Sequence, residues 1–226
     1  MLIQWIASLA VLAVASYYDL KQRLIPDTPW LVGAVVGIIL NALFFKGDLL
    51  EYLLKFAPLG LILLVSWKWK LMGEADILAY LTIAVMTPSY PNGIDSPLIP
   101  AFSTFIYSKL LLLVVPLFQF AYNLYSVRKD PSLLKGFDEP LWRKLLALFF
   151  LSPKKRGIGD VPAEIVDEKG RRKFVLSAIA SPLSEEDLDT SGWVAPAYPL
   201  LPMILVGHLM SMLLGDPITI VRMLYS

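Results

Sequence analysis

Long runs of apolar residues, separated by short polar loops, occupy most of the chain. A bilayer core about 30 Å thick is crossed by a helix of roughly 20 apolar residues. We expect the first run to be a retained span rather than a signal peptide, because it has no basic residue at its start and no convincing cleavage site. The pattern predicts an all-α polytopic membrane protein with six transmembrane helices, at residues 1–18, 30–45, 49–67, 77–87, 98–125 and 193–214.

A charged stretch interrupts this pattern between the fifth and sixth runs. We expect it to form a small α+β cytoplasmic insertion that associates with the membrane. Residues 141–150 are too short to span, and their aromatic and basic side chains favour a helix in the inner interface; a buried core helix is the alternative. Residues 163–166 and 174–179 flank the charged turn 167–172 and predict a β-hairpin, which an acidic loop at 181–190 follows.

Basic residues cluster after the odd-numbered runs. Lys21 and Arg23 follow the first run, Lys68 and Lys70 follow the third, and 12 of the 20 basic residues follow the fifth. Basic loops face the cytoplasm in membrane proteins, so we expect the N-terminus outside. Three parts result: a five-helix membrane part that carries the candidate motifs, the cytoplasmic insertion, and a sixth helix with a tail, at residues 1–126, 127–191 and 192–226.

Composition narrows the possible chemistry. Hydrophobic residues make up 57% of the 226 residues and charged residues 17%, and the mean hydropathy is +0.63. The 20 basic and 19 acidic residues balance, which argues against a nucleic-acid partner. The absence of cysteine excludes disulfides, thiol catalysis and cysteine-bound metals, and the single His208 argues against a histidine metal site or a serine triad. We therefore expect no metal or cofactor, and chemistry carried by carboxylates, hydroxyls or lysine.

Two aspartates are expected at the same membrane face. Asp19 follows about 27 Å of helix, at 1.5 Å per residue, and lies at the inner end of the first span. Asp76 opens the fourth span, and the two spans between them return the chain to the cytoplasmic side. Ionisable residues near membrane depth are candidates for function. The alternative is that Asp19 is an interfacial anchor and that Asp76 favours a helix N-terminus.

Two neighbouring carboxyl groups can perform hydrolysis without thiol, metal or histidine. Close carboxylates cannot both ionise cheaply, so a pair can share one proton; one group then activates water while the other donates a proton. Gly73 lies three residues before Asp76 and would allow a substrate backbone or a helix to approach closely. Ala75, directly before Asp76, also has a small side chain.

The residues around both aspartates match a known family. Residues 19–27, Asp-Leu-Lys-Gln-Arg-Leu-Ile-Pro-Asp after a first span, resemble the first motif of type IV prepilin peptidases. Residues 73–76, Gly-Glu-Ala-Asp, resemble their second motif, GxGD, which presenilin-like intramembrane proteases also carry. Residues 193–216, with Pro196, Pro199, Pro202 and the final Gly-Asp, are similar to the last span of archaeal preflagellin peptidases.

The resemblance implies an aspartic endopeptidase with Asp19 and Asp76 as the catalytic pair. It implies that the substrates are preflagellin or related pilin-like precursors, whose short basic leader is cleaved at the inner membrane face. Ala75 replaces the second glycine of the motif, and the cysteine-rich cytosolic domain of many bacterial relatives is absent, which argues against their N-methyltransferase activity. The role of the insertion is open.

Several other residues have two interpretations. Glu74 and Asp27 flank the candidate pair and could attract a basic leader, or could be ordinary exposed acids. Lys109, within the fifth run, could pair with a carboxylate or extend to the interface. His208 is expected to be a hydrogen-bonded packing residue. A proton-coupled transporter that uses the same carboxylates, and a silent assembly scaffold, are the competing functions, although no inverted repeat supports a transporter.

Overall fold

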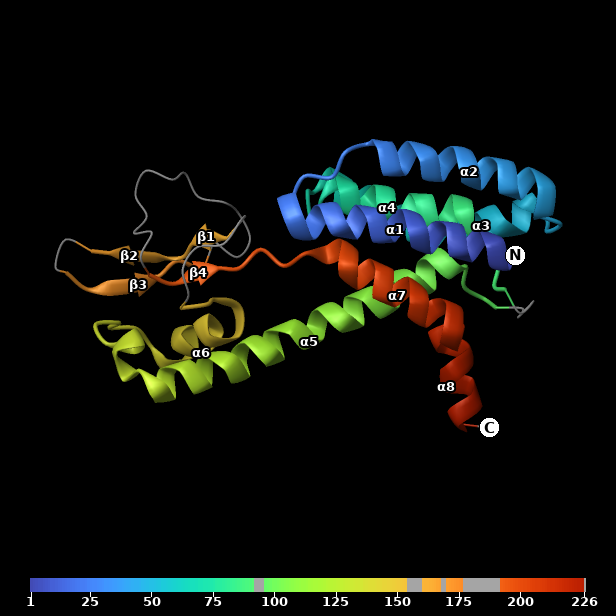
Figure 1. Cartoon of the computed structure of the whole chain (residues 1–226). Helices are drawn as coiled ribbons and strands as arrows, with labels where there is room; N and C mark the ends of the chain where they lie inside the picture. Colours follow the sequence, from blue (N-terminus) through green and yellow to red (C-terminus); the bar gives the residue numbers. More distant parts are fainter. Residues whose placement is uncertain (92–95, 154–159, 168–169, 177–191, 226) are drawn as a thin grey trace. The chain divides into compact units, whose positions relative to one another are not determined.

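The computed structural model describes residues 1–91, 96–153, 160–167, 170–176 and 192–225 (Figure 1). Helices dominate these residues. Their order is α1 (Leu2–Gln22), α2 (Thr28–Phe44), α3 (Leu49–Lys68), α4 (Glu74–Met86), α5 (Pro100–Lys129), a 3₁₀ turn (Pro131–Leu134), α6 (Leu141–Phe150), α7 (Leu200–Leu214) and α8 (Pro217–Tyr225). Four short strands lie between α6 and α7: β1 (Val161–Pro162), β2 (Glu164–Val166), β3 (Arg172–Phe174) and β4 (Val194–Ala195).

Within the described residues, α1, α3 and α5 are long and apolar enough to cross a membrane, and α2 and α7 are shorter apolar helices. The helix α4 has 13 residues, or about 20 Å at 1.5 Å per residue, which is less than the hydrocarbon thickness. A mostly helical membrane protein is therefore confirmed, whereas the number of six spans stays a prediction.

The chain forms two compact units, Met1–Leu112 with Pro199–Ser226, and Leu113–Tyr198. In the first unit, α1 packs against α2, α4 and α7, and α4 also contacts α2 and α3 (Figure 1). The buried core of this unit is apolar and draws on all these helices, with Leu12, Trp30, Leu59, Tyr80, Ile83, Leu201 and Ile204 among its members. Many outward side chains, such as Leu31 and Leu61, are more than 60% exposed, which suits a lipid environment.

Two glycines of α2 allow its close approach to α4. A Cβ atom on Gly33 would lie 2.5 Å from the Thr82 Cγ2 atom, and one on Gly37 would lie 3.0 Å from the side chains of Val85 and Met86. The spacing is that of a small-xxx-small contact, which membrane helices use to bring their backbones together. This close packing fixes α4, and with it the start of α4 where Asp76 lies.

The second unit has its own core beneath two antiparallel strand pairs, β1–β4 and β2–β3. The β2–β3 pair forms a hairpin where one was expected, with Glu164 opposite Phe174, but β3 begins at Arg172, inside the predicted turn, and shares only Phe174 with the predicted strand 174–179. The helix α6 coincides with residues 141–150; Ala147 and Leu148 are buried while Trp142 is 58% exposed. The helix thus contributes to a core and also offers an apolar face, and its placement in the membrane interface stays a prediction.

Polar groups complete the second unit. The Asn123 amide donates hydrogen bonds to the carbonyl oxygens of Leu148 and Leu151 and so caps the end of α6. Glu164 is 2% exposed, forms an ion pair with Arg172, and accepts a hydrogen bond from the Trp193 N–H. The acidic loop expected at 181–190 and the end of the second strand at 177–179 lie outside the described residues.

Candidate active site

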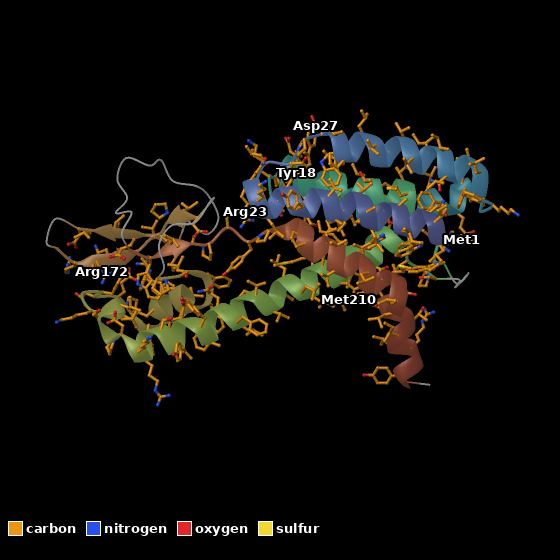
Figure 2. All side chains as sticks on the ribbon, in the orientation of Figure 1. Met1, Tyr18, Arg23, Asp27, Arg172 and Met210 are labelled. Atoms are coloured by element: carbon orange, nitrogen blue, oxygen red, sulfur yellow. The ribbon has the colours of Figure 1, made fainter. Side chains whose placement is uncertain are left out.

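Asp19 lies in the last turn of α1, at the end of the helix opposite Met1. Figure 2 shows its neighbours Tyr18, Arg23 and Asp27 at that end of the first unit. The Asp19 carboxyl is buried, with 8% of the residue exposed, and its Oδ2 atom accepts a hydrogen bond of 3.2 Å from the Leu201 N–H. Leu201 belongs to the first turn of α7, where unpaired N–H groups and the helix dipole favour a negative charge. The start of α7 therefore holds Asp19 in place.

Arg23 supplies a positive charge to the same carboxyl. Its guanidinium lies 3.7 Å from the Asp19 Oδ1 atom. The residue ends α1 in the left-handed region, with a φ of 57°, and its N–H donates to the Asp19 carbonyl oxygen. Left-handed backbone at a non-glycine residue costs on the order of 1 kcal/mol, and such strain is often found at functional sites. Lys70, six residues before Asp76, has a similar φ of 52°.

Asp76 lies in the first turn of α4. Gly73 is the N-cap of this helix, and its carbonyl oxygen accepts hydrogen bonds from the N–H groups of Asp76 and Ile77. A Cβ atom on Gly73 would lie 3.1 Å from the Asp76 Oδ2 atom. The missing side chain thus makes room for the carboxyl itself. Ala75 is half-buried and packs against the core.

The two carboxyl groups lie within electrostatic range of each other. The charge on Asp19 acts on Asp76, and so does the charge on Lys109 of α5. The structure therefore brings together the two aspartates that the sequence places at one membrane face, and it adds a cation to each: Arg23 beside Asp19 and Lys109 near Asp76. Two close carboxyl groups can exchange one proton and activate a water molecule between them.

The two other acidic candidates are exposed. Asp27 is the N-cap residue of α2, and its side chain makes no capping bond there. Glu74 lines a groove of about 560 Å³ between α3 and α4, together with Ile77, Leu78 and Leu81. These apolar residues project from a different side of α4 than Asp76, at 100° per residue, so the groove lies beside the carboxyl pair and does not contain it.

A buried aspartate outside the candidate pair has a structural role. Asp216 precedes α8, and its carboxyl accepts hydrogen bonds from the Thr219 N–H at 2.9 Å and from the Ser96 hydroxyl at 2.7 Å. Burial alone would raise the pKa of Asp216, but these bonds and that from the Thr219 hydroxyl outweigh it and hold the pKa below its ordinary value. Asp216 therefore caps the start of α8 and is not suited to donate a proton.

His208 is fully buried in a polar contact among α1, α5 and α7. Its Nε2 atom lies 2.7 Å from the Ser8 hydroxyl, its Nδ1 atom lies 3.0 Å from the Thr104 hydroxyl, and its ring stacks on Trp5. This is the hydrogen-bonded packing residue that the sequence predicts. In the part of the chain that the structure describes, no cluster of three histidine, aspartate or glutamate side chains is placed to hold a metal ion.

Two contacts that support the site were not predicted from the sequence. The Leu201 N–H comes from a residue 182 positions away from Asp19, and no local pattern signals that contact. The close approach of α2 and α4 did have a signal, because Gly33 and Gly37 have the spacing of a membrane-helix contact.

Comparison with known proteins decides the family. The model of the type IV leader peptidase family matches residues 6–122, more than half of the chain and a range that includes Asp19, Asp76 and Lys109. The chain belongs to the type IV leader peptidase family. It is similar to the preflagellin peptidase of Methanocaldococcus jannaschii, with 25% identity over 226 residues that cover 96% of each chain. It is also similar to the preflagellin peptidase of Methanococcus voltae, with 24% identity over 238 residues that cover 96% of this chain and 97% of the relative. The chain is therefore a membrane peptidase, and the carboxyl pair is the candidate for its chemistry.

Proposed function

We propose that this peptidase is an aspartic endopeptidase that removes the short basic leader from preflagellin or related pilin-like precursors at the cytoplasmic membrane face. The observation that carries the proposal is the pair formed by Asp19 and Asp76, two carboxyl groups from separate helices that interact within the region matched by the family. The names of two relatives that match over nearly their full length support the substrate. No observation favours a transporter.

The environments of the two carboxyl groups favour different roles. Asp19 has a guanidinium at 3.7 Å and a backbone N–H at 3.2 Å, and both contacts stabilise its ionised form. Within the described residues, no cation lies within 4.0 Å of the Asp76 carboxyl. Asp76 therefore lacks the close positive charge that favours the ionised form of Asp19. We therefore assign Asp19 as the general base and Asp76 as the general acid.

The reaction then runs in two balanced steps. Asp19 takes a proton from water, the water oxygen forms a bond to the scissile carbonyl carbon, and Asp76 gives its proton to the carbonyl oxygen. The resulting tetrahedral diol collapses: Asp76 takes back a proton from one hydroxyl, Asp19 gives its proton to the leaving amine, and the C–N bond breaks. Both carboxyl groups return to their starting protonation states, and no metal or cofactor takes part.

The proposed topology places this chemistry at the boundary of membrane and cytoplasm. Six spans with the N-terminus outside would put the ends of α1 and the start of α4 on the cytoplasmic side, as the distribution of basic residues predicts. Water is available there, and the apolar stem of the precursor can stay in the bilayer. Glu74 and Asp27, both exposed at this end, are proposed to attract the basic leader.

The proposal is tested with the purified protein and a preflagellin substrate in detergent, with the cleaved product identified by mass. Asp19→Asn and Asp76→Asn should each abolish cleavage without loss of the folded protein. The matched control is Asp48→Asn, because Asp48 is an exposed N-cap of α3 and asparagine caps as well as aspartate does. Full activity of either active-site variant would refute the mechanism, and no cleavage by the unaltered protein would refute the substrate.

A further inference from the structure

Lys109 is a half-buried cation inside an apolar helix. It lies in the part of α5 that belongs to the first unit, among leucine and phenylalanine side chains. A lysine at such a depth is costly unless it reaches water or a partner. Its Nζ atom lies 5.3 Å from the centre of the Phe105 ring, and the Phe105 ring in turn contacts the ring of Tyr80 on α4. Lys109 thus lies on the side of α5 that contacts the helix of Asp76.

Contacts one turn away fix this arrangement. Tyr80 follows Asp76 by four residues, so the two side chains lie on one face of α4. The Tyr80 hydroxyl lies 2.6 Å from the Ser108 hydroxyl, and its ring contacts that of Phe105 edge-on at 5.3 Å. The face of α4 that carries Asp76 is therefore held against the face of α5 that carries Lys109.

The helix α7 fixes α5 at the same level. A Cβ atom on Gly207 would lie 2.8 Å from the Ser108 nitrogen, so the two backbones are in direct contact next to Lys109. The first turn of the same helix donates a hydrogen bond to Asp19 through Leu201. One rigid helix thus sets the positions of the Asp19 carboxyl and of the segment that carries Lys109.

We propose that Lys109 is a positioning residue for Asp76: its ammonium group orients the Asp76 carboxyl and stabilises the carboxylate formed when Asp76 gives its proton to the substrate. This inference rests on the proposed function. Asp19 of α1 and the exposed Glu74, on the same helix as Asp76, are negative groups near it. Without Lys109, negative charge would develop on Asp76 near the carboxyl group of Asp19, and the ammonium group that offsets it would be missing.

The stabilisation belongs to the transition state and not to substrate binding. A charge that is favoured only as the proton leaves Asp76 raises kcat and leaves KM nearly unchanged. An opposite charge near a carboxyl group favours its ionised form, so loss of Lys109 should lower kcat by about tenfold or more. A lysine that only extends to the membrane interface would have no such effect.

The experiment compares Lys109→Met, Lys109→Gln and Lys109→Arg in the full-length protein, with kcat and KM measured on preflagellin. The methionine and glutamine variants should lose kcat by at least about tenfold with KM within about twofold, and the arginine variant should restore most of kcat because it restores the charge. Lys55→Met is the matched control, since Lys55 pairs with Glu51 on α3 and lines a pocket with residues 88–90, beyond the end of α4 opposite Asp76. It should retain full activity.

The outcomes are distinct from those of the proposed function. Cleavage by the unaltered protein that depends on Asp19 and Asp76, together with full kcat in Lys109→Gln, overturns the positioning role alone. An arginine variant as inactive as the methionine variant, with an unchanged melting temperature, also overturns it, because charge would then not be what matters. If Lys109→Met does not fold, the comparison of the glutamine and arginine variants decides the question.

Discussion

The crowding of Asp76 by a side chain at position 73 offers a sharp test of the site. Gly73 has an ordinary φ of −63°, so its backbone accepts any residue, and the effect of a substitution is one of space. An added Cβ atom would lie 3.1 Å from the Asp76 Oδ2 atom, where ordinary contact begins at 3.4 Å. Alanine therefore displaces the carboxyl by about 0.3 Å, and a branched side chain such as valine displaces it further. Because a misplacement of about 1 Å costs on the order of a hundredfold in rate, alanine should lower kcat severalfold and valine about a hundredfold.

Serine at the same position separates activity from stability. The N-cap position of α4 has the extended backbone that serine favours, and glycine is a slightly weaker cap there. Gly73→Ser should therefore keep or slightly raise the free energy of unfolding, by at most a few tenths of a kcal/mol, while its Cβ crowds Asp76 as alanine does. A loss of kcat without a loss of stability is the signature of a group moved at the reacting centre.

The assay measures kcat for leader cleavage and the melting temperature in detergent for the unaltered protein and for the alanine, serine and valine variants of Gly73. The expected order of kcat is glycine, then alanine and serine, then valine. Full activity in the valine variant would refute the reasoning, since the Asp76 carboxyl would then not need the space that Gly73 leaves. A fall in activity that only follows a fall in melting temperature would do the same.

Two further predictions concern charge and packing. Glu74→Lys and Asp27→Lys should slow the cleavage of a basic leader more than that of a neutralised leader. Glu51→Lys, a change at an exposed residue of α3, is the control and should affect neither. Equal effects on both leaders would exclude the recognition role. His208→Phe should lower the free energy of unfolding by about 1–3 kcal/mol, because the Ser8 and Thr104 hydroxyl groups lose a buried partner. Its kcat below the melting transition should be unchanged, and a selective loss of kcat would assign His208 to the chemistry.

Local patterns predicted much of the helical architecture. The first apolar run and the polar residues after it predict a helix that ends near the Asp19 motif, and α1 ends at Gln22. Residues 141–150 form α6 with the predicted limits, because a proline precedes them and the apolar periodicity stops at Phe150. The β2–β3 hairpin was predicted too, but its second strand begins at Arg172, within the predicted turn, and shares only Phe174 with the predicted strand. A period of two cannot tell where pairing ends.

Contacts between distant helices were beyond such patterns. Whether Lys109 turns inward or toward the interface depends on the rotation of α5, which Ser108 and Gly207 fix through contacts with α4 and α7. The sequence therefore left both interpretations open, and in the structure the Lys109 ammonium group lies against the Phe105 ring, which contacts Tyr80 of α4. The hydrogen bond from Leu201 to Asp19 likewise depends on where α7 begins, which is after Pro196 and Pro199 and with Pro202 in its first turn. The spacing of these prolines did not predict that start.

The two aspartates lie at opposite kinds of helix end, and different groups contact each carboxyl. Asp19 lies near the end of α1, where the dipole of its own helix is unfavourable to a negative charge, and the Arg23 guanidinium and the Leu201 N–H contact its carboxyl. Asp76 sits in a helix start, where the dipole of α4 already favours negative charge, and it needs only space from Gly73 and a more distant cation. The proposed assignment of base and acid therefore rests on the Arg23 guanidinium and the Leu201 N–H at Asp19, and not on the dipoles of the two helices. Arg23→Gln, which removes the guanidinium beside Asp19, should therefore lower kcat for leader cleavage. An unchanged kcat in this variant would show that Asp19 does not need that charge.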